Sequence, residues 1–415
     1  MNLNSYLKLM VQQLASDLFL SVGAPAGIKI EGRTQPVDGV AMTVPQIEGI
    51  ARELMSEDQR AEFAGTLEMN LAHDEAGAGR FRINLYRQRG DIAIAIRYIP
   101  DRIPAIEELN LPPILKDLIM LPQGLVLIVG PSGSGKSTAL ASMIDYRNTK
   151  TTGHILTVEE PIEYLHTHKK SIVDQREVGL DTLSCANALK NAMRESPDVI
   201  MIGEIRDRET MQAAISYAET GHLCLSTLHS TNANQTLERI INFFPEDTRS
   251  QVLLDLSLNL RAVVSLRLLH GAASRRIPAV EVLLKTPYVS DLIAKGQVDL
   301  LRDAMKESTD NGMQSFGDAL FHLYRDGKIS YEEALSHADS RNDLQLRLRL
   351  SGDTSRDASA TEAERMHLEP LAGAPGQIDP GAWLGTSIGS HEAANRHREA
   401  RLRAQTNSSG PVRPA

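Results

Sequence analysis

The sequence predicts an α/β protein, with a small α+β domain first and a larger domain built on a doubly wound parallel sheet after it. Three observations predict this fold. The 415 residues suffice for two or three domains at roughly 150 residues each. From residue 114 to about 270, short continuous apolar runs alternate with helix-like stretches, a pattern typical of parallel strands that are covered on both faces. One of these runs leads through a glycine-rich loop into a helix-like stretch.

Residues 1–100 carry the patterns of the small α+β domain. Apolar residues at helical spacing predict a helix over Leu3–Leu14, and Thr43 is suited to cap a second helix over Pro45–Met55. Short or alternating apolar runs predict four strands, at Asp17–Leu20, Gly27–Glu31, Phe81–Gln88 and Ile92–Ile99. Prolines and weak patterning predict a linker over residues 101–113.

Residues 114–277 are expected to form the parallel-sheet core. Its predicted strands are Gly124–Val129, His154–Val158, Val199–Ile202 and His222–Leu225. The apolar-rich stretch Gln251–Leu269 predicts one long helix, and residues 278–350 are expected to form a mostly helical third unit. Residues 351–415 are rich in Gly, Ser, Ala and Pro, which predicts a disordered tail because such a segment buries too little surface to offset chain entropy.

Composition narrows the classes of function. The chain has 44 Lys+Arg and 53 Asp+Glu, a net charge of −9, which disfavours a general nucleic-acid binder. No stretch approaches the ~20 apolar residues of a membrane-spanning helix, so we expect a cytoplasmic protein whose membrane association is peripheral. The two cysteines, Cys185 and Cys224, cannot build a four-cysteine zinc site.

The strongest chemical signal is a phosphate-binding loop between a predicted strand and a predicted helix. Glycines let backbone N–H groups close around phosphate oxygens, and the following helix N-terminus favours negative charge. In such a loop the lysine reaches the β- and γ-phosphates, and the next hydroxyl binds Mg²⁺. The residues that match G-x-x-x-x-G-K-[ST] are Gly130, Pro131, Ser132, Gly133, Ser134, Gly135, Lys136, Ser137 and Thr138.

A carboxylate that joins the Ser137 hydroxyl in binding the metal ion is expected at the end of another strand. Glu204 follows the apolar run Val199–Ile202 directly, apart from Gly203. Open α/β sheets bind ligands beyond the carboxyl ends of their strands, so Glu204 is predicted to hold Mg²⁺ or its bound water beside Ser137. The alternative is an ordinary exposed carboxylate at a strand end.

Three further glutamates follow the strand that ends near Val158. A carboxylate near the γ-phosphate can orient or deprotonate water, and the tight loop that Pro161 fixes could aim Glu163 into the site. Spacing alone does not choose among Glu159, Glu160 and Glu163. A solvated acidic loop is the alternative for all three.

Histidines and arginines supply the remaining candidates. His222 and His229 stand at the two ends of one strand-like run, where each could contact phosphate, pair with a carboxylate, or serve only in capping and packing.

Arginines on or beside the paired strands of the first domain could reach nucleotide across a domain or subunit boundary. For any single arginine a solvated basic face is the simpler interpretation. The candidates are Arg82, Arg89 and Arg97.

These motifs resemble those of the secretion ATPases. Gly130–Thr138, Thr157–His166, Ser196–Asp207 and Gly221–His229 have the order and spacing of the family's Walker A, Asp, Walker B and His boxes. The resemblance is strongest to the type IV pilus retraction ATPases, PilT and PilU, and covers about residues 1–345. It implies a PAS-like domain followed by a RecA-like P-loop ATPase domain, with ATP bound between them.

The same resemblance implies roles and partners. It makes Glu163 the catalytic glutamate and Glu204 the Walker B glutamate, places His222 and His229 in the His box, and sends Arg82 and Arg97 toward nucleotide. It also implies a homo-hexameric ring motor at the cytoplasmic, inner-membrane base of the pilus. Its partners there would be a PilT-like paralogue and a platform protein of the inner membrane, with no nucleic acid.

Two features within the resemblance narrow it further. The motif AIRNL of PilT is absent after Pro287, where the chain reads Tyr288–Leu292, and the later stretches Gly312–Phe316 and Asp326–Ala334 look more like PilU. We therefore expect a PilU-like motor that supports retraction. The alternatives are a nucleotide-binding accessory subunit of a PilT-like motor, and a pilus-extension or type II secretion ATPase. Relatives of the latter kind usually carry a tetracysteine zinc module, which this chain lacks.

Overall fold

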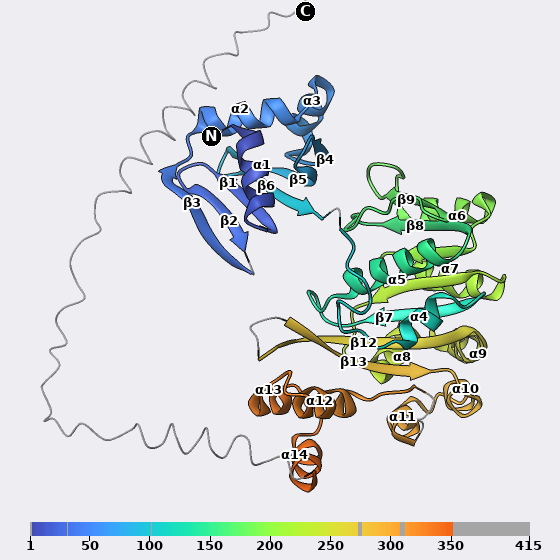
Figure 1. Ribbon diagram of the computed structural model, residues 1–415. Helices are drawn as coiled ribbons and strands as arrows, with labels where there is room; N and C mark the ends of the chain where they lie inside the picture. Colours follow the sequence, from blue (N-terminus) through green and yellow to red (C-terminus); the bar gives the residue numbers. More distant parts are fainter. Residues whose placement is uncertain (1, 31, 101, 273–275, 308–311, 352–415) are drawn as a thin grey trace, which may run out of the picture. The chain divides into compact units, whose positions relative to one another are not determined.

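The computed structural model describes residues 2–30, 32–100, 102–272, 276–307 and 312–351 (Figure 1). The chain divides into two compact units, Met1–Thr354 and Ser355–Ala415, and every described residue belongs to the first. The tail expected over 351–415 therefore lies outside the described residues, apart from Ser351. Among the helices described, none combines the length and the apolar character that crossing a membrane requires.

The N-terminal part is an antiparallel sheet of six strands in the order β3-β2-β1-β6-β5-β4. Three helices bury apolar side chains against this sheet in one core, to which they contribute Leu7, Ile47 and Phe63. The strands are β1 (Asp17–Ser21), β2 (Pro25–Ile30), β3 (Arg33–Ala41), β4 (Glu68–Glu75), β5 (Gly79–Gln88) and β6 (Asp91–Ile99). The helices are α1 (Leu3–Gln12), α2 (Val44–Leu54) and α3 (Glu57–Thr66).

The sequence predicted two helices and four strands of this part, and all six are confirmed with small shifts at their ends. Thr43 is the N-cap of α2, as expected, and the Gln46 side chain accepts its backbone N–H at 2.8 Å. Three elements of this part, β3, α3 and β4, were not predicted from the sequence. β3 is an edge strand whose residues are mostly exposed, so its sequence lacks the alternation that burial of one face imposes.

The second part is a seven-stranded sheet in the order β13-β12-β7-β11-β10-β8-β9, parallel except for β13, which confirms the expected doubly wound α/β fold. Its strands are β7 (Gly124–Val129), β8 (Gly153–Glu159), β9 (Ser171–Glu177), β10 (Val199–Ile202), β11 (Leu223–Leu228), β12 (Leu260–His270) and β13 (Arg276–Leu284). Helix α4 (Ile114–Ile119) precedes the first of these strands. The helices between the strands are α5 (Lys136–Lys150), α6 (Cys185–Ala192), α7 (Arg208–Glu219), α8 (Ala233–Asn242) and α9 (Arg249–Asn259).

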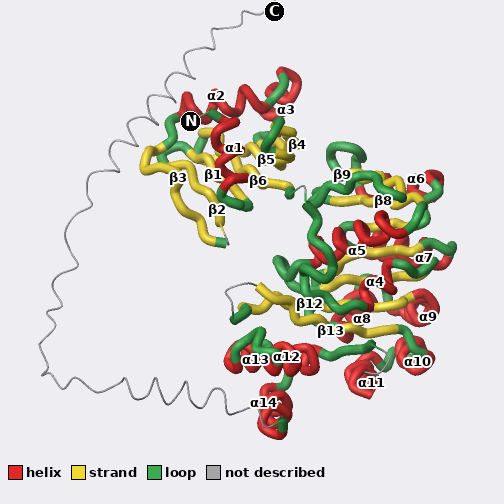
Figure 2. Tube along the Cα trace, in the orientation of Figure 1, coloured by secondary structure: helices red, strands yellow, loops and turns green. Residues whose placement is uncertain are grey.

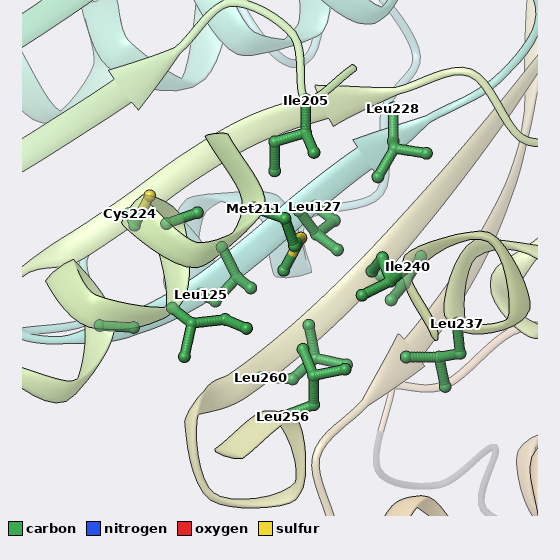
Figure 3. Packing of buried hydrophobic residues seen from close by; sticks show 14 of the residues in the cluster. Leu125, Leu127, Ile205, Met211, Cys224, Leu228, Leu237, Ile240, Leu256 and Leu260 are labelled. Atoms are coloured by element: carbon green, nitrogen blue, oxygen red, sulfur yellow. The ribbon is translucent and has the colours of Figure 1, made fainter. Parts of the chain in front are cut away.

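Helices cover both faces of this sheet (Figure 2). Along β7, Leu125 and Leu127 pack toward α7 and α9, whereas Val126 and Ile128 pack toward α4 and α5, since successive strand residues point to opposite faces. Figure 3 shows the first of these cores, where Met211 of α7 lies close to Leu127. Both faces of β7 are thus apolar, which explains the continuous apolar run that identified it.

The prediction of one long helix over Gln251–Leu269 is wrong. The chain is helical only as α9, which ends at Asn259, and then continues as β12 between β7 and β13. β12 is buried on both faces, with Val263 in one core and Val264 in the other. A strand buried on both faces is as uniformly apolar as a buried helix, so periodicity could not separate the two.

The last described residues pack helices against the edge of the sheet. The expected limit of the ATPase core at residue 277 falls inside β13, so the sheet continues into the stretch that was expected to be mostly helical. The remaining helices are α10 (Pro287–Ala294), α11 (Leu301–Glu307), α12 (Phe316–Arg325), α13 (Tyr331–Ser336) and α14 (Arg341–Leu350). Arg267 of β12 joins them to the sheet, because its guanidinium lies 3.8 Å from the Phe316 ring centroid and pairs with Asp339 at 2.8 Å.

Candidate functional site

The loop between β7 and α5 has a backbone that only glycine permits at its entry. Gly130 has a φ of 154°, and a Cβ placed there would lie 2.4 Å from Ser134 Oγ and 2.6 Å from the Leu266 carbonyl oxygen. Gly133 and Gly135 also have positive φ, at 75° and 92°. The loop therefore curls tightly over the end of β7 and delivers the chain to the N-terminus of α5.

Lys136, the first residue of α5, is directed back into this loop. Its Nζ donates hydrogen bonds to the carbonyl oxygens of Gly130 and Pro131, both at 2.9 Å. Burial lowers the pKa of Lys136, while the charges of Glu204 and Glu163 act in the opposite direction. The ammonium group is thus held in the loop and lies within the electrostatic reach of two carboxylates.

Glu204 and His229 meet Lys136 at the same edge of the sheet. β7, β11 and β10 are parallel neighbours, so the residues that follow them emerge side by side. Glu204 Oε1 lies 3.1 Å from His229 Nε2, and His229 Nδ1 lies 3.5 Å from Lys136 Nζ. The structure therefore brings together three residues that the sequence placed in three separate motifs.

The three glutamates after β8 have different surroundings. Glu159 is buried, and Thr157 Oγ1 donates to its Oε1 at 2.7 Å. Glu160 is exposed and pairs with Arg206 at 2.8 Å, after which the chain passes through a cis peptide bond to Pro161. Glu163 is exposed and lines the cleft described next. Of the three, only Glu163 combines exposure with an influence on the pKa of Lys136.

A cleft of about 750 Å³ contains these groups. Among the candidates from the sequence it is lined by Ser132, Gly133, Gly135, Lys136, Ser137, Thr138, Glu159, Glu160, Glu163, Glu204, His229 and Arg97. Asp17 and Lys29 of the N-terminal part also line it. Its size matches that of a small-molecule site, and its charges suit a phosphorylated ligand.

Two polar residues at this site, Arg206 and Asp17, were not predicted from the sequence. Arg206 donates through Nε to Glu204 and through Nη1 to Glu160, both at 2.8 Å, so it links the two acidic loops. Asp17 accepts from Arg97 Nε at 2.9 Å. Arg206 stands two residues after Glu204, so its position in the sequence could have identified it as a candidate. The Asp17–Arg97 pair spans 80 positions, and only the pairing of β1 with β6 reveals it.

The structure places His222 away from the phosphate loop of its own chain. It precedes β11, at the amino end of the strand, and its backbone carbonyl accepts from Gly124 at the start of β7. The phosphate loop leaves β7 at the opposite, carboxyl end, so His222 does not reach the loop of its own chain. Its Nδ1 lies 3.1 Å from Thr220 Oγ1, the environment of a packing histidine.

The arginine candidates differ in position. Arg97 lines the main cleft, whereas Arg82 lines a smaller cavity of about 130 Å³ that Arg97 and Glu163 also line. Arg82 and Arg97 are register partners on β5 and β6. Arg89 lies in the turn between those strands, with a φ of 53°, and lines neither of these two cavities.

The donors available for a metal ion are few. Within the described ranges no cluster of three or more His, Cys, Asp and Glu side chains could hold a metal ion. Ser137 and Glu204 both line the cleft and offer one hydroxyl and one carboxylate. Such a set fits Mg²⁺ that is held chiefly by phosphate oxygens and water, and does not fit a metal enclosed by protein ligands alone.

The buried Glu159 makes stability depend on pH. Burial raises the pKa of Glu159 from 4.5 to about 7, so the folded chain binds this proton more tightly than the unfolded chain. The stabilising contribution is complete below pH 4.5 and is lost as the pH rises to about 7. Glu159→Gln cannot lose this proton, and its free energy of unfolding relative to wild type should increase by about 3 kcal/mol across that range. Denaturant titrations at pH 5 and pH 8 measure this; equal offsets at both pH values would contradict it.

Comparison with known proteins places the chain among secretion ATPases. The family model described as "Type II/IV secretion system protein" matches residues 105–307. The chain is 50% identical to the type IV pilus ATPase PilU of Pseudomonas aeruginosa over 370 residues, which are 89% of this chain and 97% of that protein. It is 38% identical to the retraction ATPase PilT of the same organism over 338 residues, 81% of this chain and 98% of that one.

A solved structure agrees with these relatives. The crystal structure of the pilus retraction motor PilT with bound ADP superposes with a TM-score of 0.78 at 38% identity. The match covers 83% of this chain and 99% of that chain. The likeness therefore extends over both sheets, beyond the segment that the family model matches.

Proposed function

This chain belongs to the type IV pilus retraction ATPases of the PilT/PilU family, and we propose that it is a PilU-like motor subunit that hydrolyses ATP in the cleft beside Lys136. The single observation that carries this proposal is the meeting of Lys136, His229 and Glu204 at one sheet edge, with Glu163 lining the same cleft. The greater identity to PilU than to PilT supports the PilU-like assignment.

The phosphate loop binds the nucleotide in this mechanism. Backbone N–H groups of Gly130–Thr138 surround the phosphates, and Lys136 exchanges the carbonyl oxygens that it now contacts for phosphate oxygens. Ser137 and Glu204 hold Mg²⁺, which offsets charge on the phosphates. His229 bridges Lys136 and Glu204, and is therefore suited to respond when phosphate draws the lysine away.

Glu163 acts on water in this proposal. It is an exposed carboxylate that lines the cleft and acts on the pKa of Lys136, so it can accept a proton from, or orient, a water molecule beside the γ-phosphate. Arg97 lines the same cleft and Arg82 the adjoining cavity, and we assign both to charge neutralisation during the cycle. Loss of the γ-phosphate then removes contacts that favour the closed state, which shifts the populations of open and closed subunits.

The finer organisation is also proposed from the family. Residues 1–100 form a PAS-like domain and 101–113 a linker. The RecA-like core expected over 114–277 extends to the end of β13 at Leu284, and the helices from α10 to α14 form the helical subdomain expected over 278–350, followed by the tail at 351–415. Six copies form a ring in the cytoplasm at the inner-membrane base of the pilus. A PilT-like paralogue and an inner-membrane platform protein are its partners, and nucleic acid is not.

Two measurements test this function together. The purified chain should hydrolyse ATP in a Mg²⁺-dependent reaction without any partner, because both acidic loops and the phosphate loop come from one polypeptide. Expressed in cells that lack their own PilU-like protein but retain PilT, it should restore twitching. Turnover that occurs only when a PilT-like paralogue is added would contradict the motor and support the accessory subunit. Restored pilus extension without retraction would support an extension ATPase.

A further inference from the structure

The loop that carries Glu163 is held by the side chain of a residue on the edge strand β9. Gln175 Nε2 donates to the Tyr164 carbonyl oxygen at 2.9 Å and to Glu159 Oε1 at 3.1 Å. Its Oε1 accepts the backbone N–H of His166 at 2.7 Å. One amide thus contacts the chain on both sides of Glu163.

A second side chain of β9 holds the residue just before Glu163. Glu177 Oε2 accepts the backbone N–H of Ile162 at 3.1 Å. Gln175 and Glu177 are two positions apart on the strand, so both side chains project from the same face of the sheet. Ile162, Tyr164 and His166 are therefore all fixed from β9.

These contacts matter because the loop has no regular structure of its own. Residues 160–170 lie outside every helix and strand, so their backbone groups cannot be satisfied by a neighbouring ladder. The backbone of Glu163 acts to lower the pKa of the Glu159 carboxyl group, which Gln175 in turn contacts. Thr138 at the phosphate loop adds one contact, 3.0 Å between its Oγ1 and the Tyr164 hydroxyl.

We propose that Gln175 is a positioning residue for ATP hydrolysis, whose amide, with Glu177, holds the 160–166 loop so that the Glu163 carboxylate faces the cleft. The inference rests on the proposed role of Glu163. A displacement of about 1 Å in a catalytic group can cost about 100-fold in rate, so a loop fixed by side chains rather than by a ladder makes these side chains decisive. Gln175 itself is absent from the residues that line the nucleotide cleft.

The test is Gln175→Met, which keeps the length of the side chain and removes every hydrogen bond of the amide. We expect kcat to fall about 10- to 100-fold, while KM for ATP and the affinity for ADP change less than about threefold. The control is Asp174→Asn on the opposite, exposed face of β9, which should keep wild-type kcat. Equal melting temperatures for the two variants would exclude a general loss of folding as the cause.

Two substitutions of Glu177, one conservative and one not, test its hydrogen bond to Ile162. Glu177→Gln retains an oxygen that accepts from Ile162 and should keep kcat within about threefold, whereas Glu177→Met removes it and should lower kcat about tenfold. Equal activity of the Gln and Met variants would show that the hydrogen bond to Ile162 does not matter for turnover, and would overturn the positioning role proposed for Glu177.

Glu163→Gln, measured in parallel, separates failure of this inference from failure of the proposed function. If Glu163→Gln lowers kcat but Gln175→Met does not, Gln175 has no positioning role. A Gln175→Met variant that loses ADP binding along with turnover would also overturn the proposal, because it would make Gln175 part of a purely structural framework. If Glu163→Gln retains wild-type kcat, the catalytic assignment itself is wrong.

Discussion

Glu163→Gln should lower kcat for ATP hydrolysis by about 10²- to 10⁴-fold and leave nucleotide binding nearly unchanged. The glutamine keeps the size of the side chain and removes the proton acceptor, and general base catalysis typically contributes a factor of this size. The exposed position of Glu163 beside the cleft leaves its backbone contacts untouched by the change. Steady-state kinetics together with titration of a fluorescent ADP analogue would measure the two effects separately.

Glu160→Gln is the matched control for this prediction. Glu160 stands in the same loop, is also exposed and also lines the cleft, but it pairs with Arg206 and does not affect the pKa of Lys136. An exposed ion pair of this kind contributes little, so the variant should retain kcat within about threefold. A loss of activity in Glu160→Gln as large as that in Glu163→Gln would remove the distinction between the two glutamates.

Lys136→Ala should lower kcat/KM by about 10²- to 10³-fold and also weaken the binding of ATP. Loss of one charged group that meets developing negative charge in a water-excluded site typically costs this much. The substitution also removes the positive charge that interacts with Glu204 and Glu163, so these carboxylates repel the phosphates of ATP more strongly. Turnover and isothermal titration with ATP would measure both consequences.

Lys150→Ala provides the control within the same helix. Lys150 is the last residue of α5, is exposed, and contacts the Tyr146 ring at the end remote from the phosphate loop. Its removal subtracts the same charge from the chain without touching the cleft, so turnover and affinity should match wild type. Parallel losses in the two variants would mean that net charge, and not the placement of Lys136, governs nucleotide binding.

Local motifs carried most of what could be predicted about the site. The spacing of Gly130, Gly135 and Lys136 requires one particular loop, because only glycine tolerates the backbone and the close approach found there. Glu204 was located by the apolar run before it, since a strand buried on both faces identifies itself and its carboxyl end. These features depend on a few consecutive residues, so pattern was sufficient.

Elsewhere local pattern failed for identifiable physical reasons. Leu260–His270 has the composition of a buried segment, and only pairing with β7 on one side and β13 on the other makes it a strand. His222 and His229 flank the same strand with similar neighbours, yet the direction of the strand puts only His229 beside Glu204. Both outcomes depend on partners far away in the sequence.

The amino-acid sequence by itself determined the parallel sheet, the phosphate loop and the acidic strand end, because each is encoded in a short run of residues. Only the tertiary structure decided how the three glutamates after β8 differ, which histidine reaches Lys136, and that Gln175 holds the loop around Glu163. Burial, strand direction and contacts between distant segments are properties of the packed chain, and no single stretch of sequence contains them.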